Sequence, residues 1–159
     1  MKIVVDADSC PRQARELALR AARRLGIQAV FAANRALADV SGPCARMEVC
    51  PNQENAADDR LAQLAMPGDL GITRDLGLAK RLLDKGCAVI DDRGRAFTKE
   101  NINELLSIRT FTLSLSDNGL GQPRIAGYGK KESKAFADSL DRHLARLTRP
   151  KNDWTCSAT

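Results

Sequence analysis

The 159-residue sequence contains little of several residue types, and each shortage excludes a class of protein. Aromatic residues make up only 4% of the chain, so few side chains are available to stack on unpaired nucleic-acid bases. No apolar run approaches the ~18–20 residues that cross a bilayer. The N-terminal MKIVVDADSCP has one lysine followed by acids, which does not resemble a signal peptide. We therefore expect a cytoplasmic protein that does not bind membranes.

Histidine and paired cysteines are also scarce. His143 is the only histidine, and the five cysteines form no C-x-x-C motif. A zinc site is disfavoured because it needs about four such ligands at close spacing, and an odd number of cysteines does not suit a disulfide framework. We expect reduced thiols at Cys10, Cys44, Cys50, Cys87 and Cys156.

Apolar residues are plentiful, at 43% of the chain, whereas Gly and Pro number 11 and 6. This composition predicts a globular protein, and the length suits one domain, which we place at residues 1–148, with a flexible tail at residues 149–159. The net charge is +5, and residues 120–159 hold eight basic against four acidic residues. This excess favours an anionic partner, although solubility alone explains it equally well. A homo-oligomer is compatible with the sequence.

Short apolar segments alternate with helical periodicity over the first hundred residues. We predict strands at Lys2–Asp6, Ile27–Phe31, Arg46–Val49, Asp69–Ile72 and Cys87–Ile90. Helices are predicted at Arg12–Leu25, Glu54–Ala65 and Arg74–Asp84. Strands of four or five apolar residues separated by helices are typical of a parallel sheet with both faces covered. The sequence therefore predicts an α/β fold.

Beyond Ile90 this alternation stops. Residues 91–94, which read DDRG, form a predicted turn, and helices are predicted at Lys99–Thr110 and Ser133–Leu147. Between these helices, residues 117–131 contain four glycines. Loops of this length are usually functional, so we expect a mobile lid over a binding site. The alternative is a surface linker with no function of its own.

Acidic residues follow the predicted strands at the points where the strands end. They are Asp6 and Asp8 after the first strand, Asp75 after the fourth and Asp91 after the fifth. The carboxyl ends of parallel strands meet at one edge of the sheet, where open α/β sheets bind ligands. On the predicted helix before the fourth strand, Asp58 lies about 60–70° from the centre of the apolar stripe and Asp59 about 160° from it. Only Asp58 is therefore expected to turn toward that edge.

Carboxylates that converge on one site repel one another, and a hard divalent cation relieves this repulsion. We predict that Asp6, Asp58 and Asp75 bind Mg²⁺ or Mn²⁺, and that together with Asp8 they form a catalytic group. A metal held by carboxylates is the usual means of hydrolysing phosphodiesters. The alternative is structural, because Asp8 and Asp75 each precede a predicted helix that they could cap.

Seven motifs spread over the chain read VDADSCP at 5–11, AAN at 32–34, AADD at 56–59, GDLGITRDLGLA at 68–79, DRG at 92–94, ENINELLSIR at 100–109 and KAFADSLDRHL at 134–144. They resemble the YaiI/YqxD family, bacterial proteins of uncertain function that are grouped with the PIN-like (NYN-type) nucleases. The resemblance extends from residue 2 to about residue 147. Its first and fourth motifs are the most specific.

The resemblance implies a three-layer α/β/α sandwich whose mostly parallel sheet has five strands in the order 3-2-1-4-5. It also implies an acidic Mg²⁺ or Mn²⁺ site, carried here by Asp6, Asp58 and Asp75, with Asp8 as a second acid. Asn55 stands where the resemblance leads us to expect an acid, and Asp91 can restore that charge as a further metal ligand. Asn34, in the AAN motif, is a candidate nucleic-acid-binding residue.

A nuclease also needs cations to hold the phosphates that flank its acidic centre. The candidates are Arg74 and Arg93 beside predicted acids, Arg109 near the end of a predicted helix, and Arg124, Lys130 and Lys131 in the glycine-rich segment. For each of these residues the alternative is an ordinary solvated charge. We predict RNA or another phosphodiester as the partner.

Two other functions remain open at the level of sequence. A regulatory module could bind metal and RNA in the same acidic pocket without turnover. An aspartyl-nucleophile phosphatase could use Asp6 and Asp8 as a D-x-D motif, in which one carboxylate attacks phosphorus and the other serves as acid and base. Our main hypothesis is a metal-dependent ribonuclease or phosphodiesterase.

Overall fold

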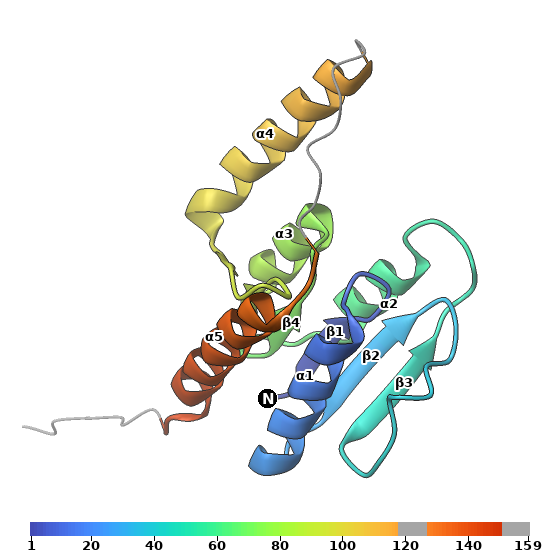
Figure 1. Ribbon diagram of the computed structural model, residues 1–159, viewed down its shortest axis with the longest axis vertical. Coiled ribbons are helices and arrows are strands. Elements are labelled where there is room, and N and C mark those ends of the chain that lie inside the picture. The colour runs from blue at the N-terminus through green and yellow to red at the C-terminus, as the bar shows by residue number, and fades with distance from the viewer. Residues whose placement is uncertain (118–126, 151–159) are drawn as a thin grey trace, which may run out of the picture.

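One sheet organises the molecule. The computed structural model describes residues 1–117 and 127–150, and in these residues six strands form a sheet in the order β3-β2-β1-β4-β5-β6 (Figure 1). The strands are β1 (Ile3–Asp6), β2 (Ala29–Ala33), β3 (Ala45–Val49), β4 (Leu70–Ile72), β5 (Ala88–Ile90) and β6 (Ala96–Phe97). All neighbouring strands are parallel except β5 and β6. The predicted α/β fold with a mostly parallel sheet is confirmed.

The expected number of five strands is wrong, because β6 adds a sixth at the edge of the sheet. After β5 the chain turns back, the backbone N–H of Asp91 donates to the carbonyl of Arg95, and Phe97 pairs with Val89 in antiparallel register. A strand of two residues is too short to produce the alternation by which a strand is recognised in a sequence. The order of the other five strands is the expected one.

The register of the central strands brings their carboxyl ends level. Val5 in β1 lies beside Ile72 in β4, and Ile72 lies beside Ile90 in β5. The next residues along the three strands, Asp6, Thr73 and Asp91, therefore meet at one edge. β1 lies in the middle of the sheet, and all four of its residues are buried, which accounts for its apolar, β-branched sequence before Asp6.

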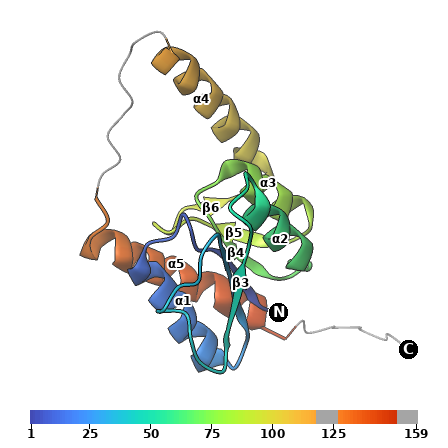
Figure 2. The same ribbon diagram turned by 90° about the vertical axis from the view of Figure 1, so that its right-hand side faces the viewer.

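Helices cover both faces of the sheet. They are α1 (Arg12–Leu25), α2 (Ala56–Leu64), α3 (Leu76–Asp84), α4 (Lys99–Asp117) and α5 (Lys130–Thr148). α1 and α5 pack with one face of the strands into one hydrophobic core, and α2, α3 and the start of α4 pack on the other face (Figure 2). In α5, Phe136, Leu140 and Leu144 recur every fourth residue and are all buried, so this face of the helix packs on the sheet.

The helix α4 is longer than its sequence pattern predicts. We expected it to end at Thr110, but it continues to Asp117 and projects from the body of the molecule (Figure 1). Ile102 near its start is buried, whereas the side chains of Ile108 and Phe111 are 53% and 64% exposed. The packed part carries the amphipathic pattern. The projecting part continues as helix because neither glycine nor proline, which would end it, occurs within Lys99–Asp117.

Most of the predicted glycine-rich loop and tail cannot be compared with the structure, because residues 118–126 and 151–159 lie outside the described residues. At the end of the predicted loop, Lys130 and Lys131 already belong to α5, which begins three residues earlier than expected. Cys10, Cys44, Cys50 and Cys87 are free thiols, as expected, and Cys156 lies outside the described residues. No helix in residues 1–117 or 127–150 combines the length and the apolarity that crossing a bilayer requires.

The turn after β5 depends on Gly94, whose φ angle is 87°. A Cβ atom at this position would lie 2.5 Å from the carbonyl oxygen of Ala135 in α5, so the turn packs directly on that helix. Gly26 also has a positive φ, 65°, but a Cβ there would contact nothing within 4 Å. Comparison of the two glycines therefore distinguishes the cost of backbone strain, which a substitution has at both positions, from the cost of close packing, which it has only at Gly94.

We expect Gly94→Ala to be much more destabilising than Gly26→Ala. A left-handed conformation costs an alanine ~1–2 kcal/mol in either variant, and overpacking against α5 adds ~1–3 kcal/mol at position 94 only. Urea denaturation of the two variants measures this difference. Equal losses of stability would show that the turn does not pack closely on α5.

Candidate functional site

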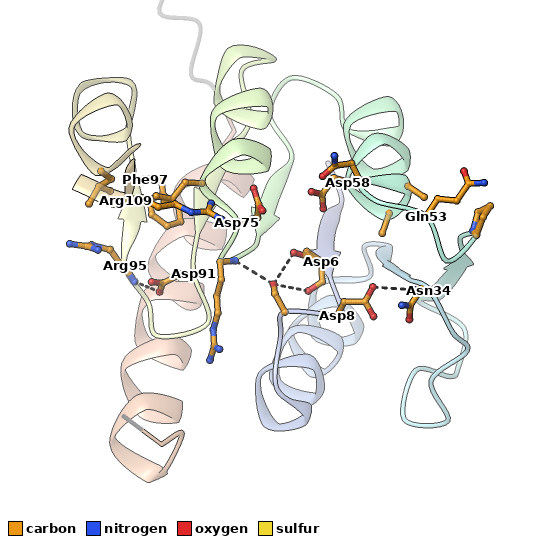
Figure 3. A pocket seen from close by; sticks show the side chains of 18 residues that line it. Asp6, Asp8, Asn34, Gln53, Asp58, Asp75, Asp91, Arg95, Phe97 and Arg109 are labelled. Atoms are coloured by element: carbon orange, nitrogen blue, oxygen red, sulfur yellow. Dashed lines mark hydrogen bonds between the residues drawn. The ribbon is translucent and has the colours of Figure 1, made fainter. Parts of the chain in front are cut away.

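A cavity of about 620 Å³ lies at the carboxyl edge of the sheet. Five carboxylates line it, from Asp6, Asp8, Asp58, Asp75 and Asp91, which are all the acids that the sequence placed in the site. Figure 3 shows Asp6, Asp8 and Asp58 in its middle, Asp91, Arg95 and Arg109 toward one side, and Asn34 and Gln53 on the other. The tertiary structure therefore brings together carboxylates that are as many as 85 positions apart in the chain.

Asp6 is the most enclosed of these acids, with 5% of its surface exposed. The hydroxyls of Ser9 and Thr73 donate hydrogen bonds of 2.8 and 2.9 Å to its Oδ2 atom. Burial raises the pKa of Asp6, and the two hydroxyls partly counteract this rise by stabilising the charged form. Both hydroxyls donate to Oδ2, so they hold the carboxylate in place and leave Oδ1 without a hydrogen bond from either of them.

Asp58 and Asp59 differ as their helical phase predicts. Asp58 is half-buried and lines the cavity, whereas Asp59 is exposed and pairs with Arg81 at 2.8 Å. Burial raises the pKa of Asp58 to about 6, and the negative charges of Asp6 and Asp75 contribute to the rise. The side chain of Asp58 accepts no hydrogen bond from the described residues, unlike those of the other four acids. It therefore carries the least compensated charge of the site.

The other three acids each have a structural partner as well as a place in the cavity. Asp75 caps α3, since its Oδ1 accepts a 2.9 Å hydrogen bond from the backbone of Leu78. The alternative in which Asp8 caps a helix is not found, because α1 begins after Pro11 without a side-chain cap. Asp8 instead accepts a hydrogen bond from the backbone of Asn34 at 3.1 Å. A structural hydrogen bond to an aspartate is therefore compatible with the place of that aspartate in the cavity.

Asp91 holds the turn that leads into β6. Its Oδ1 accepts hydrogen bonds from the backbone N–H groups of Arg93 and Arg95, at 2.9 and 2.8 Å. Burial raises the pKa of Asp91, and these two backbone donors oppose the rise. The same hydrogen bonds keep Arg95 at the rim of the cavity, so the turn positions an acid and a cation together.

The donor set suits a hard cation by its chemistry but does not form a complete cage. In the described part of the chain, no group of three or more His, Cys, Asp or Glu side chains is placed so that it could hold a metal ion directly. Mg²⁺ is commonly held by only one or two carboxylates, with water and substrate phosphate as its remaining ligands. The carboxylates of this cavity fit that open kind of site and not a closed protein cage.

The predicted cations are divided between the cavity and other surfaces. Arg74 and Arg109 line the cavity, but the guanidinium of Arg74 is bound in two places by the buried carboxylate of Asp92. Arg93 forms an ion pair in which its Nη1 atom lies 3.8 Å from Oε1 of Glu132. Neither Arg93, Lys130 nor Lys131 belongs to the cavity lining, and Arg124 lies outside the described residues. Asn34 lines the cavity, as expected, and its side chain donates to Asn52.

Several lining residues were not identified from the sequence. Ser9 lines the cavity and donates to Asp6, and its place after Asp8 in the VDADSCP motif was the available signal. Thr73 also donates to Asp6 but is not part of the lining, and it lies two residues before Asp75. Arg95 lines the cavity although only Arg93 and Arg109 were expected from that part of the chain. Gln53 and Asn55 enter the lining from the segment before α2. The resemblance marked position 55 as one where an acid is expected, whereas no sequence feature identified Gln53.

The raised pKa of Asp58 predicts a specific dependence of stability on pH. Its value of about 6 in the folded chain exceeds the ordinary value of 3.8. Between about pH 4 and pH 6 the folded chain retains a proton that the unfolded chain releases, so the free energy of unfolding falls as pH rises through this window. Asp58→Asn removes the effect and should stabilise the protein above pH 6, by on the order of 1 kcal/mol after solvent screening.

Urea denaturation from pH 4 to 8 in EDTA measures this gain, which should disappear near pH 4. Asp59→Asn is the matched control, because it removes an exposed carboxylate from the adjacent position of the same helix. A stability difference between Asp58→Asn and wild type that stays constant over the whole range would contradict the assignment.

Comparison with known proteins places the chain in a family whose members carry no stated activity. The model of the uncharacterised YaiI/YqxD family matches residues 4–146. A UPF0178 protein of Treponema denticola is 45% identical over 96% of this chain and 97% of its own length. A UPF0178 protein of Myxococcus xanthus is 41% identical over 95% of this chain and its own full length. No solved structure matches the chain. The chain therefore belongs to the YaiI/YqxD family of bacterial proteins.

Proposed function

We propose that this chain is a divalent-metal-dependent phosphodiesterase that cleaves RNA at the carboxyl edge of its sheet. The proposal depends mainly on one arrangement: five carboxylates line a single cavity together with Arg95 and Arg109. In residues 1–117 and 127–150 neither of these arginines forms an ion pair with a carboxylate, although acids surround them. An acidic centre flanked by available guanidinium groups suits a metal ion next to phosphate oxygens.

The fold expected for PIN-like nucleases supports the same proposal. The first five strands have the order 3-2-1-4-5, and helices cover both faces as in a three-layer α/β/α sandwich. We extend this arrangement to a PIN-like classification, in which the acidic edge is the catalytic one. Fold alone does not specify activity, so the residues of the cavity carry the proposal.

We assign roles to four carboxylates. Asp6 and Asp75 would hold Mg²⁺ or Mn²⁺, Asp8 would contact it through water, and Asp58 would orient the attacking water. When bound, the metal would lower the pKa of that water and neutralise charge on the phosphate. Asp6 is ready to act as a ligand because Ser9 and Thr73 fix its Oδ2. Asp58 accepts no hydrogen bond from described residues, so its oxygens remain available to the water.

Arg95 and Arg109 would hold the phosphate next to the scissile one. They come from different elements, the turn before β6 and the helix α4, and lie toward the same side of the cavity (Figure 3). The amides of Asn34 and Gln53 lie on the opposite side and offer hydrogen bonds to sugars or bases. The cavity therefore has chemically different ends, which suits a substrate that extends in both directions from the reacting phosphate.

Binding of metal should stabilise the folded chain. A ligand that binds only the folded state contributes ~2.7 kcal/mol when present at one hundred times its dissociation constant. We expect millimolar Mn²⁺ to raise the melting temperature of the wild type at pH 7–8. Asp6→Asn should abolish this increase and the cleavage of single-stranded RNA, which should otherwise yield 5′-phosphate and 3′-hydroxyl ends. Asp59→Asn should retain both properties.

The outcomes of this experiment, together with a test for beryllium fluoride binding, discriminate among the nuclease, the binding module and the phosphatase. The absence of a metal-dependent shift in the wild type would contradict the metal site. Stabilisation by Mn²⁺ and RNA without cleavage would favour a binding module. A beryllium fluoride adduct on Asp6 would favour an aspartyl phosphatase.

The role of the two arginines is tested separately. Arg95→Gln/Arg109→Gln should raise KM for RNA by about tenfold or more, because each charge-assisted hydrogen bond contributes ~1.5–3 kcal/mol, and should leave the Mn²⁺-dependent melting shift unchanged. Lys80→Gln/Lys99→Gln makes the same change in net charge outside the cavity and should have wild-type KM. An unchanged KM in the arginine variant would contradict their assignment to phosphate binding.

A further inference from the structure

The two helices on one face of the sheet carry more positive charge than the entire chain. α1 contains five arginines and one glutamate, and α5 contains five basic and three acidic residues. Together they carry +6, whereas the net charge of the chain is +5. The net positive charge is therefore concentrated on the layer of α1 and α5, and the rest of the chain has no net positive charge.

These helices pack side by side and run in the same direction (Figure 1). Near their N-termini, Gln13 and Leu17 of α1 and Lys130 and Lys134 of α5 line one shallow hollow. Farther along, Arg24 in α1 pairs with Asp141 in α5 at 2.7 Å. The seam between the helices thus has two lysines at its beginning and an ion pair farther along.

Several cations of this layer have no acidic partner among the described residues. On α1, Arg20 follows Gln13 by seven residues and Leu17 by three, which places it on the helix side that faces α5. Arg20, Lys130 and Lys134 are exposed, and none of them forms an ion pair within residues 1–117 and 127–150. Lys131 and Arg142 add exposed charge on the outer side of α5.

The chemistry of this surface favours nucleic acid over a membrane. A membrane-binding helix inserts large apolar side chains between lipids, but on α1 and α5 only Leu25, 37% exposed, is a large exposed hydrophobic residue. A row of lysine and arginine side chains without apolar anchors is typical of binding to a phosphate backbone. The seam also begins near the cavity, since α1 starts three residues after Ser9, which lines it.

We propose that the seam between α1 and α5, with Arg20, Lys130 and Lys134, binds the phosphate backbone of single-stranded RNA without reading its sequence. It would hold the strand outside the cavity, and the path of that strand into the cavity rests on the proposed function. Lys130, which the sequence placed in a lid over the acidic centre, belongs to this surface instead, and Lys131 lies on the outer side of α5.

The test is direct binding of a 20-nucleotide oligo(U), measured by fluorescence anisotropy in EDTA at increasing salt, so that neither metal nor cleavage contributes. For a single strand, the log–log salt slope falls by ~0.7 for each phosphate that a side chain no longer neutralises. Arg20→Gln/Lys134→Gln should therefore flatten the slope by ~1.4 and weaken binding at low salt by about tenfold. Lys80→Gln/Lys99→Gln, with the same net charge, should keep the wild-type slope. Thermal melting checks that both variants fold.

An unchanged slope in Arg20→Gln/Lys134→Gln overturns the proposal, and so does a wild type that does not bind oligo(U). Binding of phosphatidylserine vesicles or of polyglutamate in preference to oligo(U) overturns it in favour of a membrane or an acidic protein. A wild type that binds oligo(U) with the expected salt slope but shows no metal-dependent cleavage of RNA would count against the proposed function alone, because the binding measurement involves no catalysis.

Discussion

The burial of the Asp6 carboxylate at the end of the central strand is the constraint on which the functional edge depends. A buried carboxylate is costly unless polar groups compensate it, and here the hydroxyls of Ser9 and Thr73 do so. Each hydroxyl also accepts a hydrogen bond from the segment after β4, Ser9 from the backbone of Arg74 and Thr73 from that of Asp75. One carboxylate therefore joins the loop after β1 to the loop after β4 and positions both around the cavity.

The remaining acids illustrate how a scaffold can hold like charges together. Asp8, Asp75 and Asp91 each accept backbone hydrogen bonds that order a loop, a helix start and a turn, so each is useful to the fold by itself. Burial, together with the negative charges of Asp6 and Asp75, raises the pKa of Asp58 to about 6. The fold thus tolerates an electrostatic cost at one position, which is a common property of functional sites.

Charge is distributed unevenly over the two surfaces that the proposals concern. The cavity is acidic at its centre, with guanidinium groups toward one side, whereas the layer of α1 and α5 carries a net positive charge, with lysines at the beginning of its seam. Opposite signs on adjoining surfaces suit a polyanion whose strand is held by the basic layer while a single phosphate is neutralised by a metal in the cavity. The projecting half of α4 takes part in neither surface, except through Arg109.

The sequence by itself determined the parallel α/β fold, the carboxylates of the edge and the opposite orientations of Asp58 and Asp59. These features follow from local periodicity and from the rule that parallel strands end together, which need no knowledge of distant neighbours. Only the tertiary structure decided that Arg74 is bound by Asp92, that Arg95 reaches the cavity, and that Lys130 lies beside α1. It also decided that β6 exists and that α4 runs beyond its packed face. The physical reason is that a long, flexible side chain takes its place from partners elsewhere in the chain, and the sequence pattern around it contains no information about them. A two-residue strand is recognisable only by its pairing with another strand, because it is too short to show a pattern of its own.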